Sequence, residues 1–478
     1  MISKKIDENK KILEEEFNGS SDFSIYEFKS KSGKEFLVSY INNLVDPSSI
    51  SQYIINNLLN YENKFDITGV VAASRITEIS DMNQIIDKIL NGNIAIFIEE
   101  STIAYTVELK QYEHRAIDEP NAETVIRGPK EGFVEDLNIN KSMIRRKIKN
   151  KNLVFEDFTL GEQTKTRISV VYIKGIVNIG VLEEVKRRLF KINTDSILES
   201  GMIEEYIIDN PKTIYSTISN TQKPDVLAGK ILEGRVAVLC DGTPHALTIP
   251  KLFIESIQTS EDYYQRPYIA SLLRMVRFFS LLVSILLPGI YIALQTFHQE
   301  MIPTVFLITM SENREGVPLP AVIEATMMIL MLEFLKESGT RLPRAVGSAV
   351  SIVGALVLGQ ASVQAGIVSA PMVIIVAVAA IAEFTIPSQR EIIIYYRLFI
   401  LFLGGFIGLY GITCGLIILV VQAVTQKSFG VDYGYPLTPT NKSGLKDFLV
   451  RFPMKFFKVR PEAISKQNVT RDKSRGKK

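Results

Sequence analysis

The sequence predicts an α+β membrane protein, in which two duplicated α/β cytoplasmic subdomains are followed by an all-α, multi-pass transmembrane domain. Three observations predict this class. Segments within the first 257 residues repeat each other, apolar runs fill residues 278–424, and a basic segment runs from Lys427 to Lys478. That last segment has thirteen Lys and Arg against four Asp and Glu, a net charge of 13 − 4 = +9, although the whole chain of 478 residues carries only +2. Such a division of polarity is typical of a membrane protein.

The polar half contains an internal duplication. KILNGNIAIFIEESTIAYTV begins at Lys88 and KILEGRVAVLCDGTPHALTI begins at Lys230, and the two align without gaps at Lys, Ile, Leu, Gly, two Ala and a Thr. Upstream of each lies a second similar pair, VSYINNLVD from Val38 and VVYIKGIVN from Val170. Because both similarities occur in the same order, they indicate two related subdomains, residues 20–112 and 152–257.

Each copy predicts the same series of elements. An apolar strand is followed by a helix over 49–59 or 181–190, by a second helix that ends at the KIL triplet, and by two strands joined by a polar turn. Gly92 and Gly234 follow the second helix, where a residue in the left-handed conformation commonly closes a helix. IAIFI and VAVLC are short, continuous apolar runs, as expected of strands buried on both faces.

The remaining segments are assigned by composition. Residues 1–19 are expected to be a flexible N-terminal segment and lack the apolar stretch of a signal peptide. Residues 113–151 link the subdomains, 258–277 form an amphipathic juxtamembrane connection, and 425–478 form a basic cytoplasmic tail. Basic residues of the linker are candidates for contact with an acidic neighbour or with anionic lipid headgroups, although a solvated helix face also explains them: Arg127, Arg145, Arg146, Lys147 and Lys149.

Residues that carry enzyme chemistry do not gather in the sequence. The three histidines, His114, His245 and His298, are scattered without partners at ligand spacing. Cys240 and Cys414 are the only cysteines and lie in different halves, so no disulfide framework is expected. The sequence therefore predicts no enzyme activity, no cofactor, no metal site and no nucleic-acid binding.

The apolar half predicts about six membrane spans. A helix needs about 20 apolar residues to cross the hydrocarbon core. Four spans are expected over residues 278–297, 319–335, 346–368 and 372–386, the first interrupted at Pro288-Gly289. Residues 392–424 supply either two short spans broken near Gly404 to Gly411 or one long span. Residues 301–310 are too few to cross and fit a re-entrant segment.

Positive charge orients these spans, because Lys and Arg concentrate in cytoplasmic loops. Arg274 and Arg277 precede the first span, and KESGTRLPR, from Lys336, separates the second from the third. Both positions are therefore predicted to lie inside, as is the basic tail. A cytoplasmic tail requires six spans, and five spans with an external tail is the alternative.

Polar side chains are predicted at membrane depth, where a charge costs about 3 kcal/mol or more. Four of them are candidates for a polar path through the membrane: Glu324, Gln360, Gln364 and Glu383. A paired structural carboxylate explains Glu324 as well as an ion path does. Glu333 and Arg397 lie nearer the cytoplasmic ends, so they are expected to snorkel to the interface.

Small residues recur every three or four positions in two of the predicted spans. Such rows let helices approach closely, either within one subunit or between copies of the chain. The candidate packing residues are Gly347, Ser351, Ala355 and Gly359 in the third span, and Gly404, Gly408, Gly411 and Gly415 in the last apolar stretch.

Three long segments carry a resemblance to a known family. They are VIRGPKEGFVEDLNINKSMIRRKIKNKNL from Val125, TRISVVYIKGI from Thr166, and RLPRAVGSAVSIVGALVLGQASVQAGIVSAPMVIIVAVAAIAEFTIPS from Arg341. Through them the chain resembles the A subunits of GerA-type spore germinant receptors over nearly its whole length. The resemblance implies a two-part cytoplasmic N-terminal domain, a multi-pass domain in the spore inner membrane and a cytoplasmic tail.

The resemblance also implies partners and a function. The partners are a transporter-like B subunit that holds the germinant, a C-subunit lipoprotein, and further copies of the A subunit in a ring. Such a complex converts nutrient sensing into release of monovalent cations, which implies that this chain is part of a ligand-gated cation channel. A ring of carboxylates from identical subunits would favour cations.

Two other function classes remain beside the channel. One is a membrane-anchored signalling scaffold that relays the germinant signal without conducting ions. The other is a secondary transporter, which is disfavoured because the apolar half shows no obvious inverted repeat and few charged residues for coupling.

Overall fold

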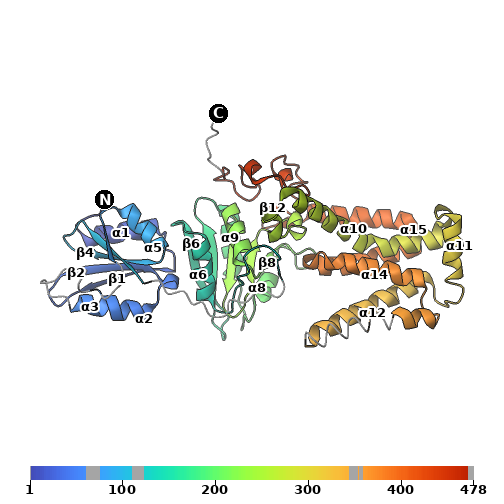
Figure 1. Cartoon of the computed structure of the whole chain (residues 1–478), viewed down its shortest axis with the longest axis horizontal. Coiled ribbons are helices and arrows are strands. Elements are labelled where there is room, and N and C mark those ends of the chain that lie inside the picture. The colour runs from blue at the N-terminus through green and yellow to red at the C-terminus, as the bar shows by residue number, and fades with distance from the viewer. Residues whose placement is uncertain are drawn as a thin grey trace.

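The computed structural model describes residues 2–60, 71, 76–109, 123–343, 354 and 359–471. Two subdomains, each built on a β-sheet, and a group of long helices follow one another along the longest axis of the molecule (Figure 1). After the last helix the chain returns to the second subdomain, and its final described residues pack there.

The first subdomain is a five-stranded sheet with helices on both faces (Figure 1). The strands lie in the order β1-β2-β4-β5-β3, and every neighbouring pair is antiparallel. The strands are β1 (Phe23–Lys29), β2 (Glu35–Ile41), β3 (Ile76–Ile79), β4 (Asn93–Ile98) and β5 (Ala104–Glu108). The helices are α1 (Ile6–Glu16), α2 (Pro47–Ile50), α3 (Asn56–Leu59) and α5 (Met82–Leu90), with a π-helical turn over Ser51–Ile55 that joins α2 to α3.

The second subdomain repeats this arrangement. Its strands lie in the order β6-β7-β9-β10-β8, again antiparallel throughout. The strands are β6 (Leu153–Leu160), β7 (Thr166–Ile173), β8 (Ser219–Thr221), β9 (Val236–Cys240) and β10 (Ala246–Ile249). The helices are α6 (Leu137–Lys147), α7 (Ile179–Leu189), α8 (Ser200–Ile207) and α9 (Pro224–Glu233).

The equal strand order confirms the duplication that the sequence predicted. The predicted helices correspond to α2–α3, α5, α7 and α9, and Gly92 and Gly234 have φ angles of 81° and 106°, in the left-handed region expected there. The α/β description needs one correction. Helices and strands alternate, but the strands pair antiparallel, so the connections are not the crossovers of a parallel sheet.

Two predicted boundaries also need correction. Residues 1–19 were expected to be flexible, but they contain the helix α1. Leu13 of this helix and Phe17, which follows it, are fully buried in the core of the first subdomain. The linker was expected to lie outside both subdomains, but α6 directly precedes β6 as α1 precedes β1. The helix α6 is therefore part of the second copy of the repeat.

The apolar half consists of long helices. They are α10 (Pro267–Phe297), α11 (Thr304–Glu312), α12 (Ala321–Arg341), α14 (Ala370–Phe384) and α15 (Arg390–Thr425). Figure 1 shows α10, α14 and α15 side by side, with α11 at the end remote from the second subdomain. The helix α10 continues through Pro288, where the sequence predicted an interruption.

The helix α15 is a hairpin of two helical segments. Gly408, inside the stretch where the sequence predicted a break, has φ 70° and ψ −150°, so the helix ends there and a second one begins. The Tyr396 hydroxyl donates a hydrogen bond of 2.5 Å to Gln422 Oε1. In a straight helix those residues would lie about 39 Å apart. Residues 390–407 and 409–425 therefore run antiparallel.

Two helical stretches of the described chain are long and apolar enough to cross a membrane, judged by length and composition alone. They are Pro267–Phe297 and Pro387–Thr425, with mean hydropathies of 2.0 and 2.2. The helix α14, with 15 residues, is apolar but shorter. Most of the predicted third span, 346–368, lies outside the described residues.

The tail is folded against the second subdomain. Phe429, Val431 and Ile464 join the core of that subdomain. A short hairpin of β11 (Lys427–Ser428) and β12 (Val431–Asp432) starts the tail, and the Ser428 hydroxyl donates a hydrogen bond of 2.6 Å to the Thr217 carbonyl. The end of the last helix therefore lies at the same end of the helix group as the second subdomain.

Cys240 is expected to be unreactive in the folded protein. Its side chain lies in the core at 1 % exposure, and burial raises the pKa of the thiol to about 12. Because the thiolate is the reactive form, maleimide at pH 8 should label Cys240 only after unfolding. Mass spectrometry of labelled peptides checks this expectation, with the partly exposed Cys414 as the internal control. Rapid native labelling of Cys240 would contradict the packing described here.

Candidate functional site

The apolar helices enclose an ion pair between Glu383 and Arg397. Glu383 lies at the end of α14 and Arg397 two turns into α15, and their side chains are only 3 % and 1 % exposed. Arg397 Nη2 donates to Glu383 Oε2 at 2.5 Å, and Arg397 Nε donates to the Ser284 carbonyl of α10 at 2.8 Å. One guanidinium thus joins three helices.

The sequence places Arg397 on the buried face of α15. Ile393 and Ile400, four residues before and three residues after it, are fully buried. Residues at this spacing share one face of a helix, so Arg397 occupies a position that an apolar residue normally takes. The expectation that Arg397 snorkels to an interface is therefore wrong, because the side chain turns inward to Glu383.

A second group of charges surrounds this pair. Lys336 of α12 donates to Glu383 Oε2 at 2.8 Å and to Glu333 Oε1 at 3.0 Å. Glu333 lies 3.8 Å from Arg397 and 3.7 Å from Arg390. Its side chain is 18 % exposed and faces these cations, so the expected snorkelling of Glu333 is also not observed. Two acids and three bases therefore form one network across α12, α14 and α15.

Glu324 lies in the first turn of α12 and is completely buried. Its Oε1 accepts hydrogen bonds from the backbone N–H of Ser369 at 2.7 Å and from the Ser369 hydroxyl at 2.6 Å. Ser369 precedes the first residue of α14, so the carboxylate also satisfies a donor at a helix N-terminus. Glu324 Oε2 lies 3.7 Å from Arg314, and no described residue donates a hydrogen bond to it.

The other predicted polar candidates do not join these groups. Gln360 and Gln364 are both exposed in the single chain, whereas Glu324 and Glu383 are buried at different ends of α14. The described part of the chain therefore does not bring the four residues together.

The glycines of the last apolar stretch lie where helices approach closely. A Cβ on Gly404 would lie 2.6 Å from the Gly289 carbonyl of α10, and one on Gly411 would lie 2.4 Å from the Leu403 carbonyl. Gly408 forms the turn of the α15 hairpin, and Gly415 faces Ile400. These four glycines thus pack helices within one chain. Gly359 has only an ordinary contact with Val373, and Gly347, Ser351 and Ala355 lie outside the described residues.

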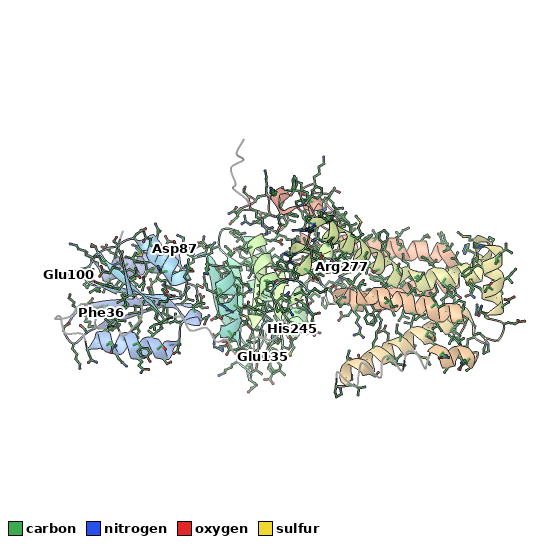
Figure 2. All side chains as sticks on the ribbon, in the orientation of Figure 1. Phe36, Asp87, Glu100, Glu135, His245 and Arg277 are labelled. Atoms are coloured by element: carbon green, nitrogen blue, oxygen red, sulfur yellow. The ribbon has the colours of Figure 1, made fainter. Side chains whose placement is uncertain are left out.

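A charged cluster that the sequence did not reveal joins α10 to the tail. Asp262 accepts hydrogen bonds from Arg277 and, at 2.8 Å, from Arg274. Arg274 also bonds Asp447 of the tail at 2.7 Å. Burial alone would raise the pKa of Asp262, but the two arginines hold it below its ordinary value. Figure 2 shows Arg277 where the second subdomain meets the helices.

Comparison with known proteins identifies the family. The profile described as Bacillus/Clostridium GerA spore germination protein matches residues 11–463. Spore germination protein KA of Bacillus subtilis (strain 168) is 43% identical over 484 residues, which cover 98% of this chain and 88% of that protein. The chain belongs to the GerA family of spore germination proteins. The family resemblance found in the sequence is thereby confirmed.

One further relative of this GerA-family protein is named as a membrane protein, and another is a receptor subunit whose N-terminal domain has a crystal structure. Uncharacterized membrane protein YfkQ of Bacillus subtilis (strain 168) is 36% identical over 476 residues, 98% of this chain and 93% of that protein. A crystal structure of the N-terminal domain of the A subunit of the Bacillus megaterium spore germinant receptor GerK3 is 30% identical. The match covers 53% of this chain and 97% of the GerK3 chain, with a TM-score of 0.43.

In this GerA-family protein, the basic residues in and after α6 have different surroundings, and Arg145 binds the first subdomain. Arg145 was expected to be exposed but is fully buried, where its guanidinium donates to both oxygens of Asp22 at 2.8 and 2.7 Å. Arg145 therefore contacts an acidic residue of the neighbouring subdomain, which is one of the two alternatives to a solvated helix face that the sequence left open. Lys149 bonds Asn91 of the first subdomain and Lys147 bonds Glu131, while Arg146 is half-buried. Arg127 is exposed, and its backbone N–H donates to Glu261.

The Arg145–Asp22 pair is expected to hold the two subdomains together. Replacing Arg145 by Met leaves the Asp22 carboxylate buried without its cation, which costs about 3–5 kcal/mol of unfolding free energy. Replacing the exposed Lys149 by Met should cost less than about 1 kcal/mol. Urea unfolding of the purified chain, followed by tyrosine fluorescence, compares the two variants. Equal unfolding midpoints for both variants would exclude this role.

Proposed function

We propose that this chain is the A subunit of a nutrient germinant receptor complex in the spore inner membrane. In this proposal the chain acts with a transporter-like B subunit, a C-subunit lipoprotein and further copies of itself, and it triggers germination without enzyme activity. Oligomerisation forms a ligand-gated channel for monovalent cations. Membership of the GerA family supports this assignment. So does the name of the relative YfkQ, which describes that protein as a membrane protein.

The contrast between the surface and the interior of the helix group supports a membrane location. Large apolar side chains point outward from α14 and α15, among them Ile374, Ile381, Phe406 and Tyr410, each more than 60 % exposed. The charged side chains of Glu324, Glu383 and Arg397 instead lie buried between the helices. Water-soluble helices normally show the reverse pattern, and lipid in contact with the outer faces would explain it.

The return of the tail supports an even number of crossings. The helix α10 begins beside the second subdomain, and the chain after α15 packs onto that same subdomain. If the helix group spans a membrane, both attachments lie on one side of it. Together with the hairpin at Gly408, this arrangement favours the six-span alternative over five, with both ends on the cytoplasmic side by the positive-inside rule.

One observation carries the channel proposal. Glu324 is completely buried among apolar helices, yet one of its oxygens accepts no hydrogen bond from the described residues. A carboxylate at such a position is expensive, and in membrane proteins such residues commonly mark ion pathways. Copies of Glu324 from several subunits would give a ring of acceptors that favours cations.

The scaffold remains the second candidate, and a different observation favours it. Arg397 and Lys336 both donate to Oε2 of Glu383, so this carboxylate is already paired with two cations of its own chain. Gln360 and Gln364 lie on the outside of the chain. A protein that only transmits a movement would need no more than the packed helices and their attachment to the second subdomain.

Ion flux distinguishes the two candidates. The purified chain, alone and with its B and C subunits, is reconstituted into potassium-loaded liposomes and exposed to germinant. The channel proposal predicts flux that Glu324→Gln alters in rate or selectivity at equal protein level, whereas the exposed control Glu300→Gln leaves it unchanged. Flux that is insensitive to Glu324→Gln would remove this residue from the path. No flux with all partners present would favour the scaffold.

A further inference from the structure

The helix α12 is packed along only part of its length. Its buried residues are Ala321, Glu324, Ala325 and Ile329, all in the first nine positions. Beyond Ile329 every residue of α12 is half-buried or exposed, and only Leu332 still touches the apolar cluster of the neighbouring helices. Leu335 instead contacts Gly354, in the segment that follows α12. Among the described residues, apolar packing therefore holds the first half of this helix more firmly than the second.

Charged groups hold that second end. Lys336 reaches Glu383 of α14 at 2.8 Å, with its side chain 9 % exposed and its ammonium 5.5 Å from the Phe384 ring centroid. Glu333 lies within 4 Å of Arg397 and Arg390 of α15. These ion pairs, the contact of Lys336 with the Phe384 ring and the partial contact of Leu332 tie residues 330–341 to α14 and α15.

The helices α10, α14 and α15 are anchored differently. Arg274 and Arg277 bind α10 to Asp262 and the tail. The turn before α15 reaches the second subdomain through the Ser388 hydroxyl, which donates to the Ser256 carbonyl at 3.0 Å. The Tyr215 hydroxyl of the second subdomain donates to the Leu419 carbonyl of α15 at 3.0 Å. These contacts tie the three helices to the second subdomain or to the tail, whereas among the described residues the second half of α12 has no hydrogen bond or ion pair to either.

We propose that the Lys336–Glu383 ion pair is a latch that opens and closes, and that residues 330–341 of α12 swing away from α14 and α15 when it opens. The inference deepens the proposed function, because it names the movable element through which a germinant receptor would change state. In this proposal Lys336 positions the second half of α12 and contacts neither ions nor ligand.

The ion pairs that remain after opening keep its free-energy cost low. When the latch opens, Lys336 keeps Glu333, which lies three residues earlier on the same helix. Glu383 keeps Arg397, which also remains bonded to Ser284. Neither side is left with an unpaired buried charge, which would otherwise cost several kcal/mol. Opening therefore replaces one shared network by two separate ion pairs, Lys336 with Glu333 and Glu383 with Arg397. Such an exchange is expected of an element with two stable arrangements.

Distances between spin labels test the latch directly in the full-length protein in nanodiscs. Labels are placed at Thr340 of α12 and Thr385 after α14, both exposed, with Cys414 replaced by Ser and the buried Cys240 retained. We expect one short distance in the parent protein. Lys336→Gln should add a longer population, or shift the distribution toward one already present, while Lys336→Arg keeps the parent distribution.

Arg341→Gln is the matched control, because the partner of Arg341 among the described residues is Glu337, on the same exposed helical face. It should leave the distance distribution unchanged. A distribution in Lys336→Gln equal to that of the parent would overturn the latch, as would equal broadening in Arg341→Gln. The distances do not depend on ion flux, so failure of the latch and failure of the proposed function are distinguishable.

Discussion

The arrangement of the apolar half depends on one buried ion pair, Glu383 with Arg397. A guanidinium and a carboxylate withdrawn from water must be placed against each other, since either one alone would be too costly to bury. Arg397 meets this requirement by bonding Glu383 of α14 and the Ser284 carbonyl of α10. The relative positions of three helices follow from that geometry, and the close contact of Gly289 with Gly404 completes it.

The same principle operates at the two other joints of the molecule. Asp22 and Arg145 are both fully buried between the subdomains, and Asp262 is buried between Arg274 and Arg277 where the helices begin. Arg145 and Asp22 lie 123 residues apart in the sequence, and Arg274 also reaches Asp447 of the tail, 173 residues away. Ion pairs thus join the first subdomain to α6, and α10 to the segment before it and to the tail.

The sequence predicted what is repeated and local, and it missed what depends on distant partners. The duplication was visible because buried central strands such as IAIFI and VAVLC keep their apolar character. The four edge strands, β1, β3, β6 and β8, were missed, because edge strands are partly exposed and carry a weaker pattern. Arg145 and Arg397 looked like surface or interface residues, since nothing near them in the sequence shows that Asp22 or Glu383 will face them. Gly408 was predictable, because a glycine-rich interruption in an overlong apolar run indicates a turn.

A double-mutant cycle on Glu383 and Arg397 tests the central role of this pair most directly. The measured quantity is the temperature at which the detergent-purified chain loses its monodisperse peak in size-exclusion chromatography. Our account predicts a large loss for Glu383→Gln and for Arg397→Met alone, because Glu333 and Lys336 replace the lost partner only in part. Substantial recovery is expected when both are combined, because the double variant removes both members of the pair. Single variants as stable as the parent protein, or a double variant whose loss is the sum of the two, would contradict it.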